Sequence, residues 1–98
     1  MTDRLRRLNL LFHIRVLGRS DQETMVRGYC SSLGAVWEGV EKTRGESWDI
    51  HLSSWAKEYT AGFGDCDALY HRATADHPAE ALVLACLRAV GCSEEELA

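Results

Sequence analysis

The chain has 98 residues and 46% hydrophobic content, enough for one hydrophobic core and too little for two independent ones. Charged residues make up 27% and there is a single proline, so the composition of a disordered chain is excluded. The net charge of −4 is unevenly placed, because residues 1–19 hold five arginines and one aspartate while the rest of the chain is acidic. We therefore expect one globular domain over residues 1–98 with a basic N-terminal end.

The apolar stretches of the chain predict neither a membrane span nor an exported protein. The longest, residues 79–90, is interrupted by charges and is shorter than the roughly 20 residues that a bilayer requires. Residues 8–17 follow several arginines, as in a signal peptide, but His13 and Arg15 interrupt them and no small-x-small cleavage site follows. We expect a cytoplasmic protein whose four cysteines stay reduced.

The first element is predicted to be a helix over residues 1–18. Its apolar residues recur at spacings of three and four, which places Leu5, Leu8, Phe12 and Val16 on one face. Gly18 is expected to end this helix. Residues 18–28 then form a polar connection, which is the best candidate for a mobile loop.

A second helix is predicted over residues 30–43. It should begin at one of three small side chains that can accept a hydrogen bond from free backbone N–H groups: Cys30, Ser31 or Ser32. The spacing of its apolar residues places four side chains in the core: Leu33, Val36, Trp37 and Val40.

After Gly45 the apolar residues alternate with polar ones, which indicates strands. Residues 47–74 are predicted to form a three-stranded antiparallel meander. The first turn is expected at Ser53–Ser54 and the second in residues 62–67, with the third strand at 69–74.

A closing helix is predicted over residues 78–90. Asp76 or His77 is expected to cap it, Pro78 suits its first turn, and Gly91 ends it. Residues 93–98 form an acidic tail, expected to be solvated and frayed. The fold class is therefore a small α+β domain of the order αα-βββ-α, with a three-stranded antiparallel sheet packed against helices.

Particular residues in this order resemble the phage ABA-sandwich domain family of small phage and prophage proteins. Residues 8–18 resemble its opening helix, residues 29–42 its tyrosine-led second helix, and residues 75–87 its closing helix, while Trp48 and Trp55 stand where its paired strands carry tryptophans. The resemblance covers most of the chain and implies an ABA-sandwich-like fold. Because the matching positions are mostly apolar residues, caps or turns, it implies a phage setting rather than a particular chemistry.

The residues that could carry catalysis or bind a metal lack the usual spacing. Cys66, His71 and His77 are close in sequence, but no C-x-x-C or H-x-x-x-H pair accompanies them. A nucleophilic thiol at Cys30 or Cys66 would lack any recognisable local signature. We therefore predict no catalytic residue, no metal site and no cofactor, with core thiols and surface histidines as the default interpretation.

Two groups of residues are candidates for binding a partner. The arginines of the first helix could pair with phosphates or with an acidic protein surface, although a solvated helix face is the simpler interpretation. Two strand tryptophans could be interface anchors or could pack beneath a helix. The candidate partner-binding residues are Arg4, Arg7, Arg15, Trp48 and Trp55. Direct nucleic-acid binding is disfavoured, because the net charge is negative and no reader motif is present.

The leading functional hypothesis is a non-enzymatic phage or prophage accessory protein that binds a host bacterial protein in the cytoplasm. Its specific form, a counter-defence inhibitor of the anti-CRISPR kind, follows from the resemblance by analogy. One alternative is a sponge that sequesters a small anionic nucleotide signal at the interface of a homo-oligomer. Another is a structural or packaging accessory protein of a phage.

Overall fold

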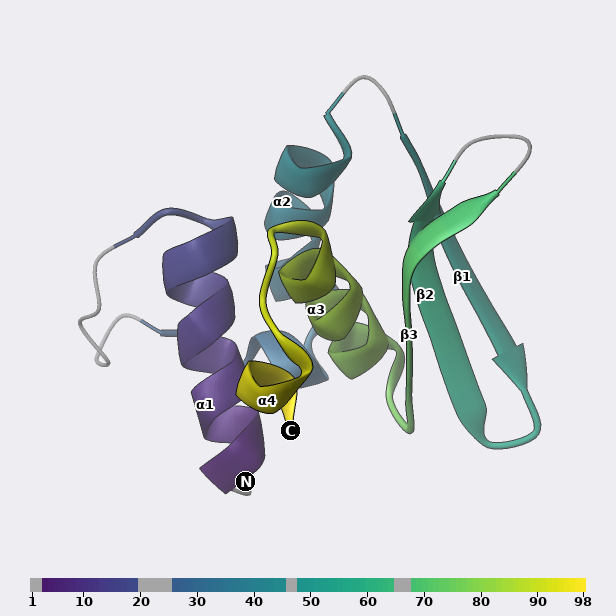
Figure 1. Ribbon diagram of the computed structural model, residues 1–98. Helices are drawn as coiled ribbons and strands as arrows, with labels where there is room; N and C mark the ends of the chain where they lie inside the picture. The colour runs from purple at the N-terminus through teal and green to yellow at the C-terminus, as the bar shows by residue number, and fades with distance from the viewer. Residues whose placement is uncertain (1–2, 20–25, 46–47, 65–67) are drawn as a thin grey trace.

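The computed structural model describes residues 3–19, 26–45, 48–64 and 68–98. These residues form helices that lie on one side of an open three-stranded antiparallel sheet (Figure 1). The predicted α+β class, with its antiparallel three-stranded sheet, is confirmed. The candidate mobile loop falls mostly on residues 20–25, which lie outside the described residues.

The first helix begins as α1, Asp3–Leu11, and continues as the π-helix η1, Phe12–Val16. Its predicted apolar face is buried at Leu8, Phe12 and Val16. Gly18 follows with a φ of +67°, a conformation that glycine adopts without steric cost. The periodicity of the sequence therefore located the helix, and Gly18 located its end.

The second helix, α2, spans Leu33–Arg44 and follows the short 3-10 helix η3, Tyr29–Ser31. Among the three predicted caps, Ser32 is the one used, since its Oγ accepts a hydrogen bond from the Ala35 N–H at 3.2 Å.

The prediction that Trp37 and Leu33 are core residues is wrong, because each is 45% exposed. The buried face of α2 is centred instead on Val36, Gly39 and Val40. The ring of Phe12 lies directly against Gly39, where any side chain would collide with it. Because of this close approach, the Gly39 side of α2 faces the core, and Trp37 lies at the edge of the buried face.

The sheet has the strand order β1-β2-β3, with β1 at Asp49–Trp55, β2 at Glu58–Gly64 and β3 at Leu69–Ala75. β1 and β2 pair without interruption from Asp49↔Gly64 to Trp55↔Glu58. The predicted turn at Ser53–Ser54 is therefore wrong, since these residues pair with Thr60 and Tyr59 within the strands.

The first hairpin turns at Ala56 and Lys57 instead. Ala56 has a φ of +56°, as a two-residue hairpin requires at its first position, where glycine is the usual residue. The sequence carries no glycine signal at this turn.

The second predicted turn was placed to begin too early. Gly62 and Gly64 are buried residues of β2, and a side chain on Gly62 would collide with Leu69 of β3. Both glycines therefore serve close packing of the two strands rather than a turn. Asp65 and Asp67, predicted in the same turn, lie outside the described residues.

The closing helix α3, Pro78–Ala89, lies between the sheet and the other helices (Figure 1). His77 caps it, with its Nδ1 accepting a hydrogen bond from the Ala79 N–H at 3.1 Å. Residues 81–87 are buried all round, because β2 and β3 cover one side of the helix and η3 and α2 contact the other.

The expectation of a frayed tail is wrong. Residues Glu94–Leu97 form the short helix α4, which starts with a capping box between Ser93 and Glu96. Leu97 is buried in the core cluster. An apolar residue that follows three glutamates thus anchors the end of the chain.

Candidate protein-binding surface

The candidate arginines of the first helix do not converge on one site. Arg4 forms an ion pair with Glu80 of α3 at 3.7 Å, and Arg15 forms one with Glu96 of α4 at 3.6 Å. Arg7 is exposed and has no ion pair among the described residues. Two of the three guanidinium groups therefore connect the first helix to the C-terminal helices, so their charges contribute to the fold.

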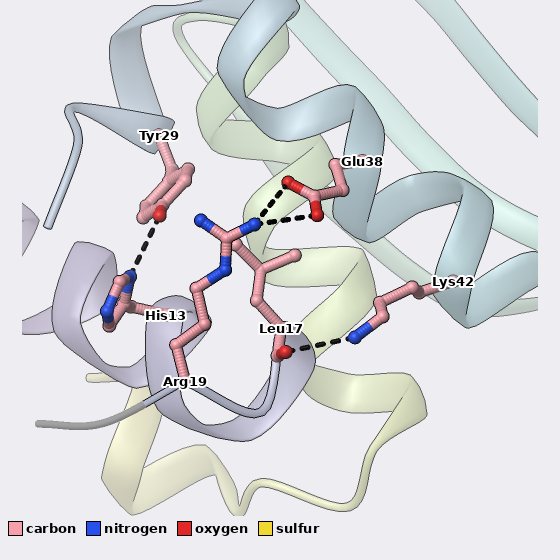
Figure 2. A network of polar contacts seen from close by, with 6 residues as sticks. All are labelled: His13, Leu17, Arg19, Tyr29, Glu38 and Lys42. Atoms are coloured by element: carbon pink, nitrogen blue, oxygen red, sulfur yellow. Dashed lines mark hydrogen bonds and ion pairs between the residues drawn. The ribbon is translucent and has the colours of Figure 1, made fainter. Parts of the chain in front are cut away.

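A second set of polar contacts, not foreseen from the sequence, connects the end of η1 to α2 (Figure 2). Arg19 donates to both carboxylate oxygens of Glu38, at 2.8 and 3.0 Å. Lys42 Nζ donates to the backbone carbonyl of Leu17 at 3.0 Å, where a helix ends and its carbonyls need donors. These contacts hold two helices together.

The interior contains a hydrogen-bonded histidine and tyrosine, each 1% exposed. His13 Nδ1 lies 2.9 Å from the Tyr29 hydroxyl (Figure 2). Nearby, Asn9 Oδ1 accepts a hydrogen bond from the Cys30 N–H at 2.9 Å. Buried polar groups of this kind are hydrogen-bonded as a rule. No substrate can reach them, so they position η3 against the first helix.

A signal for this buried cluster was present in the sequence. Asn9 and His13 are four residues apart in an otherwise apolar part of the first helix, and therefore share a face with core residues. A polar pair at core spacing predicts internal hydrogen bonds.

The described cysteines are buried free thiols: Cys30, Cys86 and Cys92. Burial raises the pKa of Cys30 and of Cys86 from 9.0 to about 12, and it also raises the pKa of Cys92. Because the thiolate is the nucleophile, the raised pKa values lower the reactivity of these three thiols at neutral pH. Cys66 lies outside the described residues.

The histidines considered for a metal site have separate structural positions. The ring of His71 packs on that of Trp48 with a centroid distance of 5.2 Å, and His77 caps α3. Within the described ranges no group of three potential ligands comes together.

The two candidate tryptophans have opposite environments. Trp48 is half-buried on the helix side of the sheet, where its ring also contacts Phe63 at a centroid distance of 6.0 Å. Trp55, the last residue of β1, is 87% exposed. Of the five candidate partner-binding residues, Arg7 and Trp55 are thus the ones whose side chains are exposed and form no ion pair or ring contact within the described part of the chain.

The surface around Trp55 is the β1–β2 hairpin, residues 49–64. Every residue of β1 except Ile50 is exposed, and Leu52 is 43% exposed although it faces the helix side. Lys57 and Glu58 flank Trp55 with charged side chains at the turn. An aromatic residue within a polar rim is the arrangement found at the centre of protein interfaces.

No helix in the described ranges combines the length and the apolar character needed to cross a membrane. Comparison with known protein families, with curated proteins and with solved structures finds no match for this chain. The resemblance to the phage ABA-sandwich family therefore remains a prediction, and function has to be argued from the geometry.

Proposed function

We propose that this protein is a non-enzymatic binding protein that recognises a protein partner through its β1–β2 hairpin, with Trp55 as the anchor. The observation that carries the proposal is the 87% exposure of a tryptophan beside a two-residue turn. A tryptophan buries a large apolar area on binding and is enriched among the residues that dominate interface energies. Its exposure in the free chain is difficult to explain by folding alone.

The charges of the molecule favour a protein partner over a small anion. A sponge for an anionic nucleotide would need converging arginines, but Arg4 and Arg15 pair with Glu80 and Glu96 on different helices. The hairpin instead presents an apolar side chain with one base and one acid beside it. This composition suits a mixed protein surface.

The biological setting in this proposal follows from the resemblance to phage ABA-sandwich proteins. The chain would then act as a phage or prophage accessory protein in the bacterial cytoplasm. Its partner would be a host protein, and blocking a component of a defence system is the form of that activity which we propose.

The test compares two tryptophan variants of the tagged protein. Trp55→Ala removes the hairpin anchor, while Trp37→Ala removes a partly exposed tryptophan from α2 and serves as the matched control. A host protein should be retained at fixed stoichiometry in native mass spectrometry of wild type and Trp37→Ala. With that partner purified, Trp55→Ala should weaken binding by about 2 kcal/mol or more, roughly 30-fold.

Two results would contradict the proposal. One is equal binding of the purified partner by Trp55→Ala and wild type. The other is the absence of any protein partner together with retention of a species of nucleotide mass, which would support the sponge instead.

A further inference from the structure

The two edges of the sheet differ in how they are protected. The β3 edge carries a bulge at which His71 and Arg72 face the single residue Gly62, and His71 has a φ of +52°. The Arg88 side chain of α3 also donates a hydrogen bond to the backbone carbonyl of Arg72. A bulge and a charged side chain on the backbone are common ways of preventing a further strand from pairing.

Within the described ranges, the β1 edge has none of these protections. β1 is a seven-residue strand in unbroken register with β2, and it contains neither proline nor lysine. Its one acidic residue, Asp49, stands at the start. No other strand of the described residues pairs with its outer edge. Its backbone N–H and C=O groups on that edge are therefore available to a further strand.

We infer that β1 pairs with β1 of a second copy, antiparallel and about a two-fold axis at Leu52, so that one sheet runs through both copies. In this register Leu52 faces Leu52 of the second copy, His51 faces Ser53, Ile50 faces Ser54 and Asp49 faces Trp55. Two-fold pairing of this kind is self-complementary, since each copy supplies the same strand to the other.

Length selects this register among the alternatives. Centring on Leu52 pairs all of residues 49–55, whereas centring on His51 would pair only 49–53 and centring on Ser53 only 51–55. Asp49, the charged end of the strand, meets the neutral Trp55, so the register brings no like charges together.

The faces of the strand favour the same arrangement. Leu52 pairs with Ala61, which is buried on the helix side, so Leu52 faces that side too, although it is 43% exposed. The two-fold axis covers this exposed leucine with its own copy as a directly opposed cross-strand pair. A register that set Leu52 opposite His51 or Ser53 would instead place the helix side of one copy against the open side of the other.

The pairing leaves the proposed anchor accessible. Trp55 lies three positions beyond Leu52 and therefore points to the open face of the sheet. The dimer would present one Trp55 at each end of the interface. Because self-association needs no partner, it can succeed or fail independently of the function proposed for Trp55.

Sedimentation velocity of the full chain tests the pairing from low micromolar to submillimolar concentration. Wild type should shift from monomer to dimer mass over this range. Leu52→Lys places two ammonium groups directly opposite each other and should raise the dimer dissociation constant by about tenfold or more, with an unchanged circular dichroism spectrum. A monomer at every concentration would overturn the inference, as would a Leu52→Lys dimer of unchanged affinity.

Cross-linking tests the register itself. In a Cys66→Ser background, Leu52→Cys should form an intermolecular disulfide on mild oxidation, because the two-fold axis sets identical residues side by side. Ser54→Cys is the matched control on the same strand and face, and it should not cross-link to itself, because it faces Ile50. Equal cross-linking of both variants, or none at Leu52→Cys, would contradict the proposed axis.

Discussion

The buried aromatic pair of the helical half and the tryptophan at the tip of the β1–β2 hairpin have opposite environments. Phe12 and Tyr29 are buried against each other with a centroid distance of 4.7 Å, and the tyrosine hydroxyl bonds His13. Trp55 on the hairpin extends into solvent. The difference indicates that the buried pair maintains the fold, whereas the tip of the hairpin is free to bind. The inner part of the hairpin, with Ala61 and Phe63, belongs to the core.

The same division holds for charged residues. Arg4, Arg15 and Arg19 connect helices through ion pairs with Glu80, Glu96 and Glu38. None of the ion pairs among the described residues involves β1 or β2. Substitutions of residues that join the helices should therefore change stability, and those of the exposed residues of β1 and the hairpin turn should change association.

The largest expected difference in stability lies between Phe12→Ala and Trp55→Ala. Phe12 is fully buried against Gly39 and Tyr29, so its truncation should lower the free energy of unfolding by about 3–5 kcal/mol. Trp55→Ala removes a larger side chain, but because Trp55 is exposed the free energy of unfolding should change by less than about 0.5 kcal/mol. Urea denaturation of both variants measures the contrast, and similar losses would show that Trp55 contributes to the fold as much as a core residue does.

A smaller loss is expected when the buried hydrogen bond is removed without changing the packing. Tyr29→Phe keeps the ring and leaves His13 Nδ1 without its partner, at a cost of about 1–3 kcal/mol in unfolding free energy. Tyr70→Phe is the matched control, because Tyr70 is exposed. If the two phenylalanine variants unfold at the same urea concentration, the hydrogen bond does not contribute to stability.

Much of the fold could be predicted because its elements have clear periodicity and caps. The stripe of Leu8, Phe12 and Val16 located the first helix, and His77 with Pro78 located the start of α3. The alternation of apolar and polar residues predicted the strands of the sheet, but it did not predict the position of the first turn. Ala56 adopts the left-handed conformation without the glycine or asparagine that normally marks such a turn.

The candidate site was predictable only in part, because contacts between segments distant in sequence determine which of the candidate side chains are paired, buried or exposed. The sequence suggested Arg4 and Arg15 as partner-binding residues, but both form ion pairs with glutamates that lie far along the chain, in α3 and α4. Trp37 lay at the margin of an apolar stripe, and a glycine two positions later determined which side of α2 faced inward. For Trp55 the sequence allowed both an interface anchor and a residue packed beneath a helix. Trp55 is exposed because the helices lie on one side of the sheet and its side chain points to the other.

The smallest expected effect concerns the Arg19–Glu38 ion pair, which tests whether the helical half depends on its surface charges or only on its core. Both side chains are about half exposed, so a double-mutant cycle of Arg19→Ala and Glu38→Ala should give a coupling energy of about 0.2–1 kcal/mol that decreases with added salt. The Arg44–Glu41 pair lies within α2 and joins no two elements, so its cycle is the control. A coupling for Arg19–Glu38 above about 2 kcal/mol would exceed what exposed pairs provide. It would mean that the bidentate contact fixes η1 on α2 and that charge, together with the core at Phe12, holds the helical half in place.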